Sequence, residues 1–440
     1  MELLLGIDVG SSRTKAALVD ADGRELGHAA APTPFESTGG RVDMDVDALV
    51  ACLARVLDQL GDRRRLVVAV GVAGMAESGA PLDGAGRPLA RVIAWHDGRG
   101  EETVELLQDR FGDALALHAG QTANTKMTVA KLGWLLDHGL EGMTRWLGVP
   151  ELVLRALTGE EATECSLAAR TGCYDVTGHR WMPEVAEAAG FSTDVFAAVQ
   201  PAGRVMGRVT AAVSRWSGLR EGVPVTVAGH DHPAGMAGAG VGPGDLANSV
   251  GTAETVVRRT ARVPDMAAAL DNRVAVSVYP GGREWAVLVG AARAGLVIDS
   301  AAAALGLSPA ELDGLADGAE PVDADLAGAV DDLAKGGPAS LPDAPPGRIW
   351  AGLLRALTAR TVDGYERVAN VVGPAQRLVV FGGGSGSEPW LRAKVEALPV
   401  PVVRSTVASA VARGAAVHAG VAAGWWPSEA AAPRPPASAP

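Results

Sequence analysis

The sequence predicts a mixed α/β protein built from two lobes, and three observations support that expectation. The chain has 440 residues, which is too long for one ordinary hydrophobic core and suits two sizeable domains. Short apolar runs alternate with stretches of helical spacing. Acidic, glycine-bearing turns follow apolar strands at Asp8 and at Asp231, far apart in the chain. We therefore expect a cleft between the lobes that holds both turns.

Charge and hydropathy exclude several classes of protein. A net charge of −12 argues against a nucleic-acid binder, which normally carries a basic patch. The amino terminus lacks both the basic region and the cleavage site of a signal peptide. The apolar run from Val407 to Trp426 contains Arg413 and His418, so we expect a packed helix and no membrane partner.

The cysteines lack C-x-x-C spacing and fit free, buried thiols in a reducing cytoplasm: Cys52, Cys165 and Cys173.

Apolar runs and periodicity locate the elements of each lobe. In the first half we expect strands at Leu3 to Val9, Thr14 to Val19, Glu25 to Ala30 and Val67 to Val72, with a helix at Asp47 to Leu60. In the second half we expect a helix at Ile349 to Val372 and these strands: Val223 to Ala228, Asp245 to Val250, Ala253 to Arg258, Trp285 to Val289 and Arg377 to Phe381. The repeated theme predicts two lobes of related architecture.

The predicted domains are residues 1–223 and residues 224–426. Residues 427–440 are proline, alanine and serine without a core-forming pattern, and we expect them to be disordered. The segment from Asp313 to Pro346 is polar and loop-rich, and no chemistry is assigned to it.

Glycine-bearing turns supply candidate phosphate sites. Gly10, Ser11 and Ser12 allow a tight turn whose N–H groups and hydroxyls face an anion. Asp8 would then meet phosphates through a divalent cation, because a bare carboxylate is repelled by them. The turn at Gly251 and Thr252 offers a second such concavity. Each turn, taken alone, also fits an ordinary hairpin without a ligand.

Asp231 is the candidate general base, because an apolar strand delivers it into a glycine-rich bend that opens a helix-like stretch. His230 and His232 flank it and would share a side of an extended chain. We considered a metal site there, but support of Asp231 or simple packing is favoured. The chain has no Walker A sequence, which excludes a P-loop kinase. Gly238 to Gly242 resembles a dinucleotide fingerprint, but Pro243 follows where a helix should open, which argues against a Rossmann dehydrogenase.

Five segments occur in an order that matches one family: Gly6 to Lys15, Trp95 to Arg99, Gly229 to His232, Asn248 to Glu254 and Phe381 to Ser385. With these segments, spread over both halves, the chain resembles the FGGY carbohydrate kinases. The resemblance implies a two-lobed, actin-like, ribonuclease-H-like fold with ATP and Mg²⁺ bound in the cleft and a small sugar or polyol as the partner. Homodimerisation is left open.

The resemblance also assigns residues to the site. Asp231 would be the catalytic base, and Asp8 and Asp231 would each face the magnesium ion through water. The nucleotide and its phosphates would be bound by Asp8, Gly10, Ser11, Ser12, Thr14, Lys15, Gly251, Thr252, Gly382, Gly383, Gly384 and Ser385. The acceptor would be bound by Glu77, Trp95, Asp97, Arg99, Asp231 and His232.

The resemblance favours a ketopentose as the acceptor, as in xylulokinase, with a polyol as the second choice. Gly74 to Gly79 departs from both patterns, since it lacks the arginine that precedes this glutamate in glycerol kinase and has Glu77 where xylulokinase has histidine. Two functions outside catalysis stay open. They are an ATP-binding chaperone or sensor, which would consume ATP without a sugar, and a silent sugar-binding regulator, which would bind a ligand without turnover.

Overall fold

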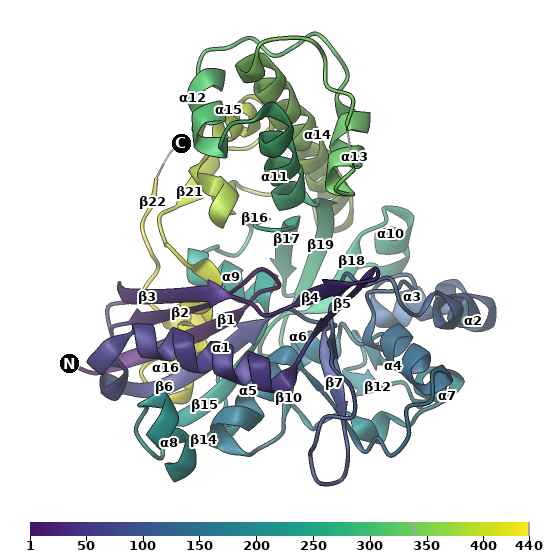
Figure 1. Cartoon of the computed structure of the whole chain (residues 1–440), viewed down its shortest axis with the longest axis vertical. Helices are drawn as coiled ribbons and strands as arrows, with labels where there is room; N and C mark the ends of the chain where they lie inside the picture. The colour runs from purple at the N-terminus through teal and green to yellow at the C-terminus, as the bar shows by residue number, and fades with distance from the viewer. Residues whose placement is uncertain (338, 439–440) are drawn as a thin grey trace.

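The computed structural model describes residues 1–337 and 339–438 and forms two lobes, with the amino-terminal strands in the lower lobe of Figure 1 and helices α11 to α15 in the upper one. The first lobe contains a six-stranded sheet. In spatial order its strands are β14 (Gly207–Arg208), β15 (Pro224–His230), β6 (Val67–Gly74), β1 (Leu3–Val9), β2 (Arg13–Val19) and β3 (Glu25–Pro32). Strands β1, β2 and β3 pair antiparallel, whereas β1, β6 and β15 pair in parallel.

The second lobe repeats this arrangement in a seven-stranded sheet. Its order is β18 (Ala275–Val278), β19 (Trp285–Ala292), β17 (Glu254–Thr260), β16 (Leu246–Val250), β20 (Leu378–Phe381), β21 (Val402–Ser405) and β22 (Ala437–Ser438). Strands β16, β17 and β19 are antiparallel neighbours, and β16, β20 and β21 are parallel neighbours. Two sheets with the same central connectivity confirm the expected α/β fold of two related lobes.

Helices cover both sheets. In the first lobe α1 (Val46–Gln59) buries Leu49, Leu53 and Val56 against the sheet, which the helical spacing predicted. In the second lobe the long α14 (Pro346–Val372) packs beside α11 (Ala294–Leu305), α12 (Pro309–Ala316), α13 (Ala327–Ala334) and α15 (Glu388–Ala397). The remaining long helices are α2 (Glu101–Phe111), α4 (Thr128–Asp137) and α5 (Val149–Thr158), and the shorter ones are α3 (Asp113–Ala119), α6 (Cys165–Ala168), α7 (Pro183–Ala188), α8 (Ala211–Ser217) and α10 (Met266–Asp271).

An extension of the first lobe carries a five-stranded sheet of β4 (Glu36–Thr38), β5 (Arg41–Met44), β8 (Val92–Ile93), β7 (Gly79–Leu82) and β9 (Arg145–Gly148). Two short pairs complete it: β10 (Thr163–Glu164) with β13 (Val199–Gln200), and β11 (Tyr174–Asp175) with β12 (Arg180–Trp181). The extension has its own apolar core around Leu107, Val129 and Leu132. It lies on the right of Figure 1, below the second lobe.

Two helices join the lobes. Helix α9 (Asp231–Ala239) follows β15 of the first sheet, and α16 (Ala410–Ala422) follows β21 of the second. They pack directly on each other, and α16 also packs on β1, β6 and β15 of the first lobe. A Cβ at Gly238 would lie 1.7 Å from the Ala410 carbonyl oxygen, and one at Gly414 would lie 1.8 Å from that of Ala234. The contact is therefore made by backbone, and only glycine fits.

The expected boundary between residues 223 and 224 differs from the structure. Strand β15 pairs with β6, so it belongs to the first sheet. Helix α16 comes late in the chain but packs on that same sheet. Sequence order therefore does not separate the lobes cleanly, because each lobe extends a helix to the other.

The expectation that residues 427–440 are disordered is wrong for residues 427–438, and residues 439–440 lie outside the described part of the chain. Strand β22 pairs with β21, and the carboxylate of Glu429 accepts hydrogen bonds from Arg259 (3.0 Å) and from the Tyr279 hydroxyl (2.9 Å). Arg413 donates to the Pro433 carbonyl (2.7 Å). The segment has few apolar side chains, but it satisfies buried polar groups that composition does not reveal.

The segment from Asp313 to Pro346, expected to be loop-rich, contains the end of α12 and the whole of α13, whose Val330 and Leu333 are buried. The three cysteines are free and buried, as expected. In the described part of the chain, no single helix is long and apolar enough to cross a membrane, and α11 with α12 would be so only together, across a bend of 82°.

Replacing Gly238 by alanine should destabilise the protein, because the added methyl group would meet the backbone of α16. Gly328 in α13 is the matched control, since a Cβ there has open space within 4 Å, and alanine should be neutral or stabilising by roughly 0.5–1 kcal/mol. Thermal unfolding compares the two variants. Equal melting temperatures would show that the contact between α9 and α16 can relax.

Replacing Glu429 by alanine should lower the free energy of unfolding by roughly 1–3 kcal/mol, because buried donors of Arg259 and Tyr279 lose their acceptor. Ser428→Ala is the control, because Ser428 is exposed and its side chain caps no helix. Chemical denaturation measures both variants. No loss in Glu429→Ala would mean that the segment contributes nothing to stability.

Candidate active site

A cavity of about 880 Å³ lies between the lobes. Its walls come from the turn after β1, the turn after β16, the amino terminus of α9 and the glycine run after β20. Of the site residues predicted from the sequence, these line it: Asp8, Gly10, Ser11, Ser12, Lys15, Glu77, Trp95, Asp231, His232, Gly251, Thr252, Gly382 and Gly383. Residues far apart in the sequence are thus brought to one site.

The two predicted phosphate turns occupy equivalent places in the two sheets. Each links the first two antiparallel strands of its sheet, and each is closed by its glycine. Gly10 N donates to Arg13 O (3.2 Å), and Gly251 N donates to Ala253 O (3.0 Å). The hydroxyls of Ser12 and Thr252 are 2.8 Å apart, so the turns meet across the cleft. Small hydroxyls from both lobes therefore face one space, which suits a polyphosphate.

Thr14 does not line the cavity, contrary to expectation. Side chains alternate along β2, so Arg13 and Lys15 face the cleft while Thr14 points inward. The Thr14 hydroxyl is buried and lies 3.1 Å from that of Thr33, which itself donates to the Gly10 carbonyl (2.6 Å). Thr14 therefore supports the first phosphate turn from behind.

The glycine run after β20 divides in the same way. Gly382 has φ +102°, and a Cβ there would lie 2.4 Å from the Val250 carbonyl oxygen. Gly382 and Gly383 line the cavity. Gly384 instead packs on the side chain of Val250, and the Ser385 hydroxyl donates to the Gly382 carbonyl (2.7 Å). Gly384 and Ser385, predicted as nucleotide ligands, thus shape the loop without lining the cavity.

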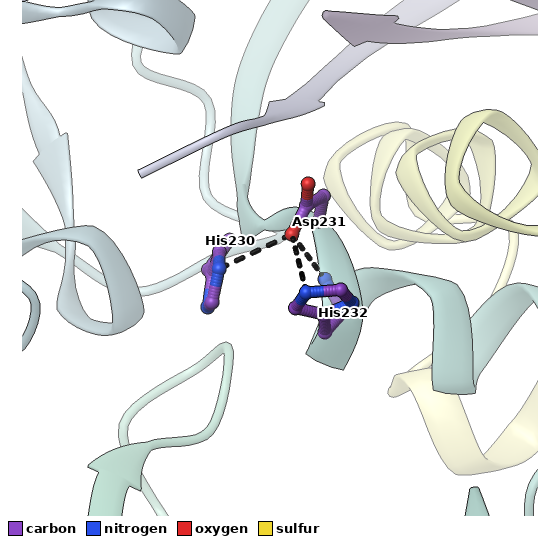
Figure 2. A group of neighbouring side chains, drawn as sticks. All are labelled: His230, Asp231 and His232. Carbon is purple, nitrogen blue, oxygen red and sulfur yellow. Dashed lines mark hydrogen bonds and ion pairs between the residues drawn. The ribbon is translucent and has the colours of Figure 1, made fainter. Parts of the chain in front are cut away.

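Asp231 is the first residue of α9, so its carboxylate lies at the positive end of a helix. Figure 2 shows His230 and His232 on either side of it. Its Oδ1 accepts from the backbone N–H of His232 (2.7 Å) and lies 3.1 Å from His230 Nε2. Within the described residues its Oδ2 makes no hydrogen bond, and the side chain lines the cavity. One oxygen is therefore held while the other faces the space between the lobes.

The pKa of Asp231 reflects two opposing effects. Burial would raise it, but the interactions with His232 and His230 outweigh burial and hold the pKa below its usual range. Burial also lowers the pKa of the His232 imidazole. Whatever the charge of that ring, the His232 backbone N–H remains a donor to the carboxylate. Asp231 is therefore ionised at neutral pH and able to accept a proton.

The two histidines do not form a convincing metal site with Asp231. One ligand atom from each of the three residues lies within 4.8 Å of the others. Both ring nitrogens of His232 already have hydroxyl partners, however, at Ser249 (3.2 Å) and Thr255 (3.3 Å). These hydroxyls belong to β16 and β17, so the geometry favours support of Asp231 by a histidine that is itself held by the second lobe.

Asp8 is the last residue but one of β1 and pairs with Ala73 of β6 in the register. Its Oδ2 lies 3.9 Å from Lys15 Nζ, and its buried Oδ1 has no partner among the described residues. Burial raises the pKa of Asp8 to about 7, although Lys15 opposes the shift. A buried carboxylate with an unmatched oxygen, beside two phosphate turns, fits a divalent cation.

On the acceptor side, the structure separates the predicted residues. Glu77 and Trp95 line the cavity, whereas Asp97 and Arg99 do not. The two Asp97 oxygens accept from Arg99 (2.7 and 2.8 Å), and one also accepts from Val42 N (2.7 Å). Asp97 and Arg99 therefore fix the loop that presents Trp95, and their contact with the acceptor stays a prediction.

Sequence reasoning missed Arg170. Its Nη2 and Nε donate to Glu77 Oε1 at 2.6 and 3.1 Å, and both residues line the cavity. Glu77 has φ +67°, an uncommon conformation for a residue other than glycine. The pair spans 93 positions, and no local pattern joins them. Gln121, Lys126 and Arg293 were missed for the same reason, since they reach the cavity only in the folded chain.

Solved structures share this fold. A structure titled as a xyloylose kinase from Brucella ovis matches with TM-score 0.86 and 20% identity, covering 100% of this chain and 94% of that one. A glycerol kinase from Plasmodium falciparum with ADP matches with TM-score 0.82 and 17% identity, covering 99% and 93%. At these identities the likeness establishes the fold alone.

Sequence relatives and family models go further. The chain is 26% identical to an L-fuculokinase from Salmonella typhi, over 97% of this chain and 92% of the relative. It is 29% identical to a xylulose kinase from Streptomyces rubiginosus, over 69% and 63%. The model of the FGGY family of carbohydrate kinases, N-terminal domain, matches residues 3–238, and that of the C-terminal domain matches residues 322–423. The chain therefore belongs to the FGGY family of carbohydrate kinases.

Proposed function

We propose that this chain transfers the γ-phosphoryl group of ATP to a hydroxyl of a small sugar, with Asp231 as the general base. Members of the family are ATP-dependent sugar kinases that use Mg²⁺. The observation that carries the residue assignment is the ionised Asp231, which faces a cavity that the two phosphate turns also line. A base and an anion site in one cavity suit phosphoryl transfer between two bound molecules.

In this mechanism the acceptor hydroxyl gives its proton to Asp231 Oδ2 as its oxygen attacks the γ-phosphorus, and ADP leaves. His230 and the His232 N–H hold Oδ1, so that the carboxylate does not rotate away. The N–H groups and hydroxyls of the turns at Gly10 and Gly251 orient the phosphates, and Lys15 offsets their charge.

Asp8 and Asp231 would hold the magnesium ion through water, in keeping with the unmatched Asp8 oxygen. When bound, the cation neutralises charge on the phosphoryl oxygens. The residues of the chain must also exclude water, because the same base would otherwise activate water and hydrolyse ATP. The Ser12–Thr252 contact across the cleft supports this role.

The finer proposal, carried by the family resemblance, is a ketopentose acceptor, with a polyol as the alternative. The relatives are named for different acceptors, including L-fuculokinase, xylulose kinase and autoinducer-2 kinase, at 25–29% identity. Homodimerisation and a cytoplasmic location remain predictions from the sequence. A regulator without catalysis is disfavoured because the base, the phosphate turns and the acceptor pocket lie in one cavity.

Asp231→Asn should lower turnover by roughly 10²- to 10⁴-fold, because the amide cannot accept the acceptor proton. Nucleotide affinity should stay close to that of the wild type. Asp109→Asn is the control, since Asp109 is exposed on α2. Acceptor-dependent ADP formation measures turnover. If Asp231→Asn keeps more than about half the wild-type rate at saturating substrate, Asp231 is not the base.

Asp8→Asn should stabilise the metal-free, nucleotide-free protein above pH 7 while abolishing most activity. The folded-state pKa of Asp8, about 7, exceeds the ordinary value of 3.8, so the folded protein keeps a proton that the unfolded chain loses between these values. Stability from this group is therefore present below about pH 4 and is lost as the pH rises towards 7.

The gain in the free energy of unfolding should thus be near zero at pH 4 and reach roughly 2–4 kcal/mol at pH 8. Urea denaturation in the presence of a chelator measures this gain across that pH range. Asp109→Asn is the control, and its effect on the free energy of unfolding should not change with pH. A variant that is less stable than the wild type at pH 8 would contradict the burial cost assigned to Asp8.

A further inference from the structure

One end of the cavity is more positively charged than a neutral sugar requires. We call it the acceptor end and define it by six lining residues: Glu77, Trp95, Gln121, Lys126, Arg170 and Arg293. It contains three cationic side chains and one carboxylate, apart from the base Asp231. The charges are close enough to interact, because Glu77, Arg170 and Arg293 all act on the pKa of Lys126. The acceptor end therefore holds an excess of positive charge.

Arg170 is only partly satisfied by its partner. Glu77 accepts two hydrogen bonds from its Nε and Nη2, both through one carboxylate oxygen. Arg170 is 7% exposed, and its buried Nη1 has no partner within the described residues. The Gln121 side-chain amide nitrogen is unmatched in the same way. Two buried donors that line a cavity call for a ligand rich in acceptor atoms.

Lys126 adds a positive charge beside these donors. Its ammonium lies 5.5 Å from the centre of the Trp95 ring and makes no ion pair or hydrogen bond within residues 1–337 and 339–438. The only hydrogen bond of Lys126 among these residues is donated by its backbone N–H to Asn124 Oδ1 (3.0 Å). Burial lowers its pKa, Glu77 raises it, and Arg170 and Arg293 lower it. Because Glu77 is already held by Arg170, Lys126 has no carboxylate of its own. An anion from the ligand would supply one.

We propose that the acceptor is a polyhydroxy carboxylate of the aldonate class, whose carboxylate is bound by Arg170 and Lys126 while one of its hydroxyls faces Asp231. This inference rests on the proposed kinase function and puts an acidic acceptor in place of the ketopentose that the family resemblance favours. The transfer itself is unchanged: the hydroxyl oxygen forms a bond to the γ-phosphorus, the bond to the β,γ-bridging oxygen breaks, and the proton passes to Asp231. The acceptor carboxylate binds and does not react.

The γ-phosphate of ATP is the other anion that these cations could serve. The phosphate turns, however, lie at Gly10 and Gly251, whereas Lys126 neighbours Trp95, Glu77 and Arg170. The position of Lys126 therefore favours the acceptor over the nucleotide. The experiment below separates the two anions.

The test compares matched acceptors. Aldonates of four to six carbons are paired with the alditols of the same configuration, which differ only in the charged end. Acceptor-dependent ADP formation gives kcat/KM for each. We expect at least one aldonate to exceed its alditol by about 10- to 100-fold, the range of a charge-assisted hydrogen bond. If neutral sugars or ketopentoses are phosphorylated more efficiently than every aldonate, the acceptor class is wrong and the kinase function stands.

Lys126→Met should reduce the ratio of aldonate to alditol efficiency by about 10- to 100-fold, mainly through KM, and leave the KM for ATP unchanged. Lys335→Met is the matched control, because Lys335 is exposed at the end of α13, away from the cavity. A raised KM for ATP with an unchanged ratio would assign Lys126 to the phosphate and overturn the proposal.

Calorimetric titration of the aldonate without nucleotide distinguishes failure of the proposal from failure of the kinase function. Aldonate binding that Lys126→Met weakens, together with no phosphorylation of any acceptor, would uphold the carboxylate site and contradict the kinase function. Binding that Lys126→Met does not weaken, at unchanged melting temperature, would contradict the carboxylate site itself.

Discussion

The direct contact between α9 and α16 is the constraint on which the site depends. Each helix follows the last parallel strand of one sheet, and the two meet where only glycine fits, with Gly238 against Ala410 and Gly414 against Ala234. This contact fixes the amino terminus of α9, and therefore Asp231, between the lobes. It also fixes how the first sheet sits against the second, so that the turns bearing Ser12 and Thr252 meet. A methyl group added at the helix contact would therefore also change how the two phosphate turns meet.

Two carboxylates, a buried one on β1 and a half-buried one after β15, have opposite electrostatic environments on either side of β6. Asp231 accepts hydrogen bonds at a helix amino terminus and is held ionised, whereas Asp8 has an unmatched oxygen and a raised pKa. The first is ready to accept a proton, and the second gains most from a cation. The division between a base and a cation ligand thus follows from the surroundings, because the two side chains are chemically identical. The surroundings also decide what the acceptor end can bind, since its cations outnumber its carboxylates.

Local sequence pattern predicted what local physics determines. Apolar runs located β1, β6, β16 and β20, and the acidic glycine turns located Asp8 and Asp231. The pattern failed where a long-range partner decides the outcome. Asp97 is bound by Arg99 and Val42 and does not line the cavity. Glu77 is bound by Arg170 from far along the chain, and Glu429 anchors a tail whose composition indicates disorder. Thr14 was misplaced for a simpler reason, because the face of a strand that points to a cleft depends on the register.

The central claim is that the base and the phosphate turns act on two molecules held in one cavity. The most direct measurement incubates the protein with ATP labelled with ¹⁸O in the γ-phosphoryl group and with a turned-over acceptor, and counts products by mass spectrometry. The account predicts one phosphorylated acceptor for each ADP, with the label in the acceptor phosphate. Labelled inorganic phosphate equal to the ADP formed, with no phosphorylated acceptor, would contradict it.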